Sequence, residues 1–209
     1  MKPFIHSRRG ENYIIDLTKT AEALESSLAF LESVVAKGES VLFVSTKRQA
    51  KDIMKVAAEK LGMPYVTERW LGGMLTNQKT IAVRIKHLKD LESKMASGEL
   101  QNKYSKLEVQ RYQEEIDDMN NKFGGIKDMA KLPGVLFVVD VMEEINAVME
   151  AKKLGIPVVA LVDTNADPSL VSHPVPCNDD AVKTIELVTG YVSAAVEAGL
   201  AKRKSATKA

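Results

Sequence analysis

Val41-Leu42-Phe43-Val44 is the stretch that decides the fold of this chain. An uninterrupted apolar run of this length is typical of a strand that is buried on both faces of a parallel sheet. Two further runs of the same kind occur in the second half of the chain, Val135-Leu136-Phe137-Val138-Val139 and the residues from Val158 to Val162. The sequence therefore predicts a sheet whose central strands are covered on both sides.

The segments around these strands have the periodicity of amphipathic helices. Apolar residues recur at spacings of three and four from residue 18 to 37 and from 181 to about 198. Gly62 and Gly155 each end a helical stretch before a proline and a strand, so one helix-to-strand motif occurs twice. Thr46 and Gln49 have the spacing of a capping box for a helix that ends at Leu61. This alternation predicts an α/β fold with helices on both faces of a parallel sheet.

Two long helical segments, 77–95 and 105–123, separate the two halves of the chain. Each has one narrow apolar stripe at heptad spacing, which Glu92 interrupts at one position in the first segment. The apolar positions are Ile81, Ile85, Leu88 and Met95, and then Val109, Tyr112, Ile116, Met119 and Phe123. Ser105 and Glu108 have the spacing of a capping box. We predict an antiparallel coiled-coil helical hairpin; two ordinary core helices are the alternative.

The predicted elements divide the chain into an α/β domain, an insertion and a tail. The domain is discontinuous and comprises residues 1–76 and 124–200, the hairpin insertion comprises 77–123, and a basic flexible tail comprises 201–209. A chain of 209 residues with 45% hydrophobic residues can bury a core of this kind. Cys177 is the only cysteine, which excludes an internal disulfide and suits a reducing, cytoplasmic compartment. No apolar run approaches the roughly 20 residues that a membrane span requires.

The charges are segregated although the chain has a net charge of only +1. From Arg69 to Lys89 there are several basic residues and no acid, and smaller basic clusters lie near Arg8 and Lys47. One-signed surfaces on a near-neutral protein indicate a polyanionic partner, whereas ordinary solvated faces are the alternative for any single cluster. The turn Arg69-Trp70-Leu71-Gly72-Gly73 would let backbone approach that partner closely. Its tryptophan could anchor the partner or simply pack in the core.

An enzyme remains an alternative, because ligands bind at the carboxyl ends of parallel strands. Asp140 and Asp163 follow two predicted strands and could hold Mg²⁺ for phosphoryl transfer. However, no strand is followed by a glycine-rich phosphate loop. The other interpretation is that Asp163 and Asp167 fold a tight turn and that Asp179 caps the last helix. We expect no catalytic residue, no metal and no cofactor, although whether the turn from Asp163 to Asp167 holds an ion stays open.

At these residues the chain resembles the bacterial ribosomal protein S2 family. The resemblance rests on the segments 69–77, 123–129 and 178–181 and on Val162-Asp163-Thr164-Asn165, among others that run in the family's order over nearly the whole chain. It implies a doubly wound, flavodoxin-like parallel sheet with an inserted coiled-coil hairpin. It also implies a structural, non-enzymatic protein of the small ribosomal subunit. Two departures are a further N-terminal segment of the family that would precede Met1, and Cys177, where the family usually has glycine.

The resemblance also implies the partners of the chain. They are small-subunit ribosomal RNA and neighbouring ribosomal proteins, including the messenger-binding protein S1, with no membrane and no small-molecule substrate. Our hypothesis is that basic side chains neutralise RNA phosphates while the glycine turn allows close approach. The candidate RNA-binding residues are Arg8, Arg9, Lys47, Arg48, Arg69, Trp70, Gly72, Gly73, Lys79, Arg84, Lys86 and Lys89. A phosphate-handling α/β enzyme and a free coiled-coil adaptor remain alternatives.

Overall fold

A five-stranded parallel sheet forms the centre of the computed structural model, which describes the backbone of residues 1–208 and side chains up to residue 205. The strands lie in the order β4-β3-β5-β6-β7. Their bounds are β3 (Val41–Val44), β4 (Tyr65–Val66), β5 (Val135–Val139), β6 (Val158–Val162) and β7 (His173–Pro176). Of these strands, β3 comes first in the chain. β4 lies on one side of β3, and β5, β6 and β7 follow on its other side. The predicted doubly wound α/β fold is confirmed, and the strand order reverses between β3 and β5.

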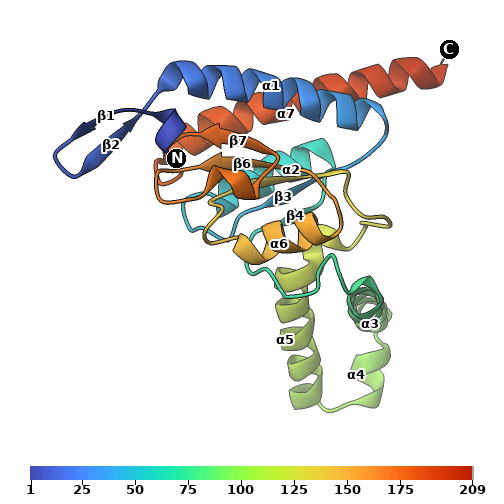
Figure 1. Ribbon diagram of the computed structural model, residues 1–209. Coiled ribbons are helices and arrows are strands. Elements are labelled where there is room, and N and C mark those ends of the chain that lie inside the picture. Colours follow the sequence, from blue (N-terminus) through green and yellow to red (C-terminus); the bar gives the residue numbers. More distant parts are fainter. Residues whose placement is uncertain (209) are drawn as a thin grey trace.

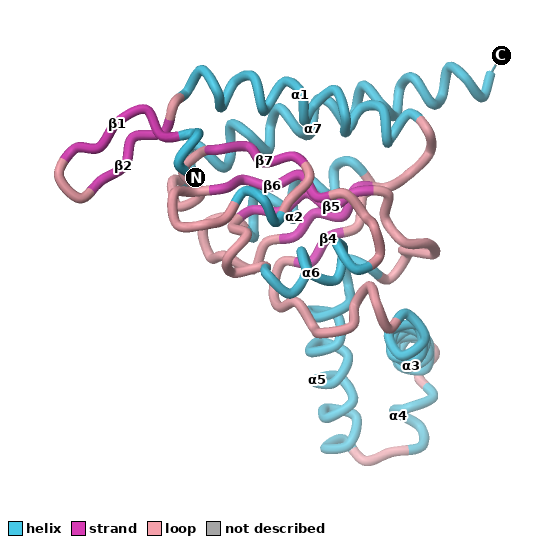
Figure 2. The backbone as a smooth tube through the Cα atoms, in the orientation of Figure 1, coloured by secondary structure: helices cyan, strands magenta, loops and turns pink. Residues whose placement is uncertain are grey.

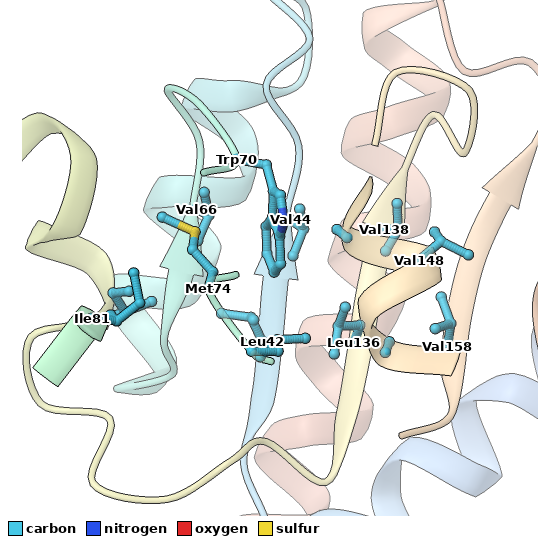
Figure 3. Packing of buried hydrophobic residues seen from close by; sticks show 14 of the residues in the cluster. Leu42, Val44, Val66, Trp70, Met74, Ile81, Leu136, Val138, Val148 and Val158 are labelled. Atoms are coloured by element: carbon cyan, nitrogen blue, oxygen red, sulfur yellow. The ribbon is translucent and has the colours of Figure 1, made fainter. Parts of the chain in front are cut away.

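Helices cover both faces of the sheet, as Figure 1 shows. One face lies under α1 (Leu17–Ala36), α2 (Lys51–Leu61) and α7 (Val182–Lys208), and the other lies under α6 (Ile145–Lys153) and the loop that follows β4. Because side chains alternate along a strand, Phe43 packs toward the first face and Leu42 toward the second. Figure 3 shows Leu42 in the cluster of buried side chains on the second face, which also contains Trp70.

The ends of the helices agree with the glycine pattern but not with every predicted cap. Gly62 and Gly155 have positive φ angles of 64° and 70°, as expected for residues that end a helix. The capping box predicted at Thr46 is wrong, because α2 begins at Lys51 and has no side-chain cap. The backbone N–H of Thr46 instead donates to the carboxylate of Glu144, the residue that precedes α6.

The N-terminal segment forms a hairpin that the sequence pattern did not predict. A short 3-10 turn, η1 (Lys2–Phe4), leads into the antiparallel strands β1 (Ile5–Arg9) and β2 (Asn12–Ile15). The hairpin projects sideways from the domain beside the start of α1 (Figure 1). Its residues are mostly exposed. Its strands therefore do not have the continuous apolar sequence that predicted β3, β5 and β6.

The insertion between β4 and β5 is helical, as predicted. It comprises α3 (Gln78–Ala96), a short α4 (Glu99–Lys103) and α5 (Lys106–Phe123), and η2 (Gly124–Ile126) joins it to the domain. The predicted helix bounds hold to within a few residues, and the Ser105–Glu108 capping box is confirmed. Figure 2 shows the long loop without regular structure that leads from β4 into α3.

The antiparallel coiled coil expected for this insertion is not confirmed. Figure 1 shows α3 end-on while α5 lies along the page, so the two helices cross. The bonds between them join His87 to Glu115 and Glu92 to Asn120, so that partner numbers rise together. In an antiparallel seam the partner numbers would run in opposite directions. Glu92 occupies a predicted seam position and accepts a hydrogen bond from Asn120 there.

The last helix extends well beyond its predicted end. α7 continues to Lys208, so residues 201–208 of the predicted flexible tail are helical, and residue 209 lies outside the described part. Lys202 Nζ lies 2.6 Å from Glu32 Oε1, which ties this extension to α1. A 3-10 turn, η3 (Pro168–Leu170), connects β6 to β7. Among the described residues, no helix has both the length and the apolar composition needed to cross a bilayer.

Candidate nucleic-acid interface

The loop from Arg69 to Asn77 is organised by one side chain of α6. The two carboxylate oxygens of Glu150 accept five hydrogen bonds from this loop. Oε1 accepts from Trp70 Nε1 at 3.1 Å and from Gly73 N at 2.7 Å. Oε2 accepts from Leu75 N at 3.1 Å, from Thr76 N at 3.0 Å and from Thr76 Oγ1 at 2.9 Å. The loop therefore has a defined shape although it lacks regular secondary structure.

These hydrogen bonds also determine the charge state of Glu150. Partial burial raises the pKa of this carboxyl group, but the donors of Thr76, Gly73 and Trp70 outweigh that effect and bring the pKa below its usual range. Glu150 is therefore ionised at neutral pH. Its negative charge lies among backbone and side-chain N–H groups that would otherwise be available to an anion.

Trp70 lies in the core rather than on the surface. Its exposed fraction is 9%, and it packs in the same cluster as Val44 and Met74 (Figure 3). The core-packing alternative for this residue is therefore the one that the structure shows. Gly72 is exposed, and a side chain added there would meet no atom within 4 Å. Gly73 has a φ of 90°, which a side chain would strain.

Most of the predicted basic residues are exposed. Within the described part of the chain, seven of them show no ion pair with a carboxylate: Arg8, Arg9, Arg48, Arg69, Lys79, Arg84 and Lys86. Lys89 is exposed as well, but its Nζ lies 3.0 Å from Asp128 Oδ1. A cation on a surface without a carboxylate partner remains available to a phosphate.

The structure does not bring these cations together into one patch. Lys79, Arg84 and Lys86 lie on α3, and Arg69 lies in the loop that precedes it. Arg8 and Arg9 lie on the β1–β2 hairpin, which is at the opposite end of the molecule from α3 in Figure 1. The Arg8 guanidinium contacts its own hairpin, since Nε donates to Gly10 O at 2.9 Å. At least two separate cationic surfaces result.

Lys47 is a correction to the predicted interface. Its exposed fraction is only 8%, and its Nζ lies 3.0 Å from Asp140 Oδ2, 2.6 Å from Asp179 Oδ1 and 2.6 Å from Asp180 Oδ1. Burial lowers the pKa of Lys47, but the bonds to these carboxylates raise it by more, so the ammonium group stays charged. It pairs with the carboxylates of Asp140, Asp179 and Asp180 and is largely withdrawn from the surface. Charge alone in the sequence could not distinguish these two roles.

The aspartates at this edge of the sheet serve structural contacts. Asp140 Oδ1 accepts from Met142 N and Glu143 N, and Asp163 Oδ1 accepts from Thr164 N. Asp167 caps η3 through Ser169 N, which agrees with the predicted tight turn. Carboxylate oxygens of Asp163, Asp179 and Asp180 lie within 4.8 Å of one another, but Lys47 already contacts two of these residues.

The predicted cap at Asp179 is wrong. Asn178 Oδ1 instead accepts from Asp180 N and Ala181 N just before α7, while the Asp179 side chain turns toward Lys47. Asp140 is engaged by Lys47, and Asp163 accepts from the backbone of Asp179 at 3.4 Å.

Two features of the interface were missed by sequence reasoning. Glu150 was not among the predicted site residues, because no local pattern connects it to the distant loop. Lys152 and Lys153 are exposed on the same helix and border a hollow of about 510 Å³ together with Gly72 and Thr76. Their position adds positive charge beside the loop.

The fold and these surfaces define a class of protein, a doubly wound α/β domain with a helical insertion and exposed cationic surfaces. Comparison with known proteins gives its family. The sequence profile described as Ribosomal protein S2 matches residues 1–199, and the chain belongs to this family of structural, non-enzymatic proteins. The resemblance found in the sequence is thereby confirmed.

Three similar proteins are described as small ribosomal subunit protein uS2. The chain is 48% identical over 199 residues to the protein of Coprothermobacter proteolyticus, with 95% of this chain and 74% of the relative covered. It is 46% identical over 205 residues to that of a Roseiflexus species, with 98% and 78% covered. It is 45% identical over 209 residues to that of Bifidobacterium longum, with 100% and 74% covered.

Proposed function

We propose that this chain is a structural constituent of the small ribosomal subunit. In this role it binds small-subunit ribosomal RNA and neighbouring ribosomal proteins, among them the messenger-binding protein S1, within the cytoplasmic ribosome. The family to which the chain belongs, and the description of its relatives as small ribosomal subunit proteins, support this assignment. The chain contributes no chemistry and acts by holding RNA segments in place.

The exposed cations are the observation that carries the RNA-binding part of the proposal. Arg69 and the α3 residues Lys79, Arg84 and Lys86 would form one contact surface, and Arg8 and Arg9 would form another. Phosphate contacts of this kind position a protein on RNA without reading its sequence, and they weaken steeply as salt is added. Lys47 has no part in the proposal, because its ammonium group is buried among carboxylates.

The domain division and the coiled-coil packing remain part of the proposal. We infer that residues 77–123 act as an arm of the domain formed by 1–76 and 124–200. Ile81 and Leu88 of α3 share one buried cluster with Ile116 of α5, and this shared packing supports the coiled-coil part of the proposal. Limited proteolysis tests the arm, and first cleavage between residues 97 and 105 is the expected result. First cleavage inside the sheet would contradict it.

Sedimentation of the tagged chain through a sucrose gradient tests the function as a whole. We expect the chain to migrate with small subunits and to dissociate as the salt concentration rises. A chain that stays at the top of the gradient at low salt would overturn the proposal. If it then kept a protein partner in the absence of ribosomes, the adaptor alternative would gain support. Saturable nucleotide binding that is lost in Asp163→Asn would support the enzyme alternative.

A further inference from the structure

We propose that Glu150 is the positioning residue of the RNA-facing loop between Arg69 and Asn77. Its role would be to hold this loop in the shape that presents Arg69, Gly72 and the start of α3 to RNA. The inference rests on the proposed function and deepens it, because it names the group on which that interface depends.

The geometry shows that Glu150 bonds to the whole length of the loop. Its donors extend from Trp70 to Thr76, and each carboxylate oxygen accepts from at least two of them. The loop has no sheet or helix ladder that could satisfy the backbone N–H groups of Gly73, Leu75 and Thr76. Without the carboxylate, these groups would have to find water, and the loop would sample other shapes.

The hydrogen bonds to Glu150 also limit the ways in which the loop can bind a nucleic acid. Successive backbone N–H groups that point into one concavity commonly bind a phosphate. Here Glu150 fills that concavity with a carboxylate, so the N–H groups of Gly73, Leu75 and Thr76 are not available to RNA. The loop must therefore act through what it turns outward, which is the Arg69 side chain and the open surface at Gly72.

The position of Glu150 on α6 extends the interface to that helix. Lys152 and Lys153 follow it closely and border the hollow that Gly72 and Thr76 also line. Fixing the loop to α6 thus places two exposed ammonium groups next to the glycine turn. A phosphate that entered this hollow at Gly72 would lie beside these lysines.

Electrostatics and positioning predict opposite effects for Glu150→Gln. This substitution removes a negative charge from a cationic surface, so electrostatics alone would make RNA binding tighter. The amide keeps the shape of the side chain but has only one acceptor oxygen for the five donors. If Glu150 positions the loop, the variant should bind small-subunit ribosomal RNA at least about tenfold more weakly.

The experiment measures the affinity of the full chain for this RNA by filter binding, together with amide hydrogen exchange. Exchange at Gly73, Leu75 and Thr76 should become faster in Glu150→Gln while the β5 and β6 amides stay protected. Glu143→Gln is the matched control, since Glu143 is an exposed acid of the same region without a side-chain bond to the loop. It should bind RNA as well as the unchanged chain or slightly better.

Each outcome decides between the proposals. Equal or tighter RNA binding by Glu150→Gln would overturn the positioning role while leaving the proposed function intact. A wild-type chain without affinity for the RNA would overturn the proposed function and this inference with it. If Glu150→Gln failed to fold, Trp70→Phe would replace it, because it removes one donor and keeps an aromatic ring in the core. This variant should bind about threefold more weakly, and unchanged affinity would overturn the role.

Discussion

Lys47 Nζ lies 2.6 Å from Asp179 Oδ1, and this contact joins the loop after β3 to the segment that precedes α7. Asp140, which follows β5, contacts the same ammonium group at 3.0 Å. A single cation thus ties together three segments at the carboxyl edge of the sheet, at the place where the strand order reverses. In many doubly wound proteins this edge holds a ligand. In this chain a lysine side chain occupies it.

Lys47→Met should destabilise the fold by about 3–5 kcal/mol, since removing one partner leaves buried carboxylates without a cation. Urea unfolding followed by circular dichroism measures the change. The matched control is Arg48→Met at the next position, which is exposed and should alter stability by less than about 0.5 kcal/mol. We expect the reverse order for RNA affinity, with a loss for Arg48→Met and none for folded Lys47→Met. A stable Lys47→Met chain would show that the ammonium group is dispensable.

Asp179 should make stability depend on pH in a distinctive direction. Burial raises the pKa of this carboxyl group from 3.8 to about 6, against the opposing effect of Lys47. Between these values the folded chain keeps a proton that the unfolded chain has lost. The stabilisation is therefore complete below about pH 4 and is lost as the pH rises through about 6. The stability difference between wild type and Asp179→Asn should fall over this window by roughly 3 kcal/mol. A difference that rises with pH would contradict the assignment.

The fold could be predicted from the sequence because its signals are local. β3, β5 and β6 are continuous apolar runs, and the glycines at 62 and 155 end helices by their own backbone preference. The β1–β2 hairpin was missed because its stability does not come from a buried apolar face. Heptad spacing does not by itself establish the coiled coil, because it shows which side chains share a face but not the helix against which they pack.

The interface was only partly predictable, for a related physical reason. The sequence gives the charge of a side chain but not whether it points into the core or into solvent. Lys47 and Arg48 therefore looked alike, although Lys47 is buried and Arg48 is exposed. The decisive contact of the loop, from Glu150 to Gly73, joins residues 77 positions apart. Such a contact exists only once α6 and the loop pack on the same face of the sheet.

Gly125→Ala should destabilise the junction between the insertion and the sheet. A Cβ at this position would lie 2.2 Å from the backbone oxygen of Tyr65, and backbone on β4 cannot move aside without disturbing the sheet. We expect a loss of about 2–3 kcal/mol in the free energy of unfolding. Gly124→Ala is the control, because its nearest neighbour would be Asn120 Oδ1 at 3.8 Å. Equal stabilities of the two variants would refute the close packing of this glycine.

Cys177 should be unreactive in the folded chain. The side chain is buried, and burial raises the pKa of its thiol to about 12, with the charges of Asp179 and Asp163 adding to the effect. Because the thiolate is the reactive form, alkylation by iodoacetamide at pH 8 should be at least about a hundredfold slower than in urea. Mass spectrometry of the alkylated chain gives the rate. Comparable rates in both conditions would mean that the thiol is reached without unfolding.

The cations of α3 provide the most direct test of RNA binding. Replacing Lys79, Arg84 and Lys86 together by alanine should weaken RNA binding and reduce its dependence on salt. Each lost phosphate contact removes roughly one unit from the slope of log affinity against log salt concentration, so a decrease of about two to three units is expected.

The insertion offers a control with the same change of charge. Lys94, Lys103 and Lys122 are already paired with Asp90, Glu99 and Asp118 at 2.7, 2.7 and 2.5 Å. Replacing these three lysines by alanine should leave the slope of log affinity against log salt concentration nearly unchanged. Each ammonium group already pairs with a carboxylate and is less available to a phosphate. Filter binding at four or five salt concentrations gives both slopes. Identical slopes for the two triple variants would mean that net charge, rather than the unpaired face of α3, determines binding.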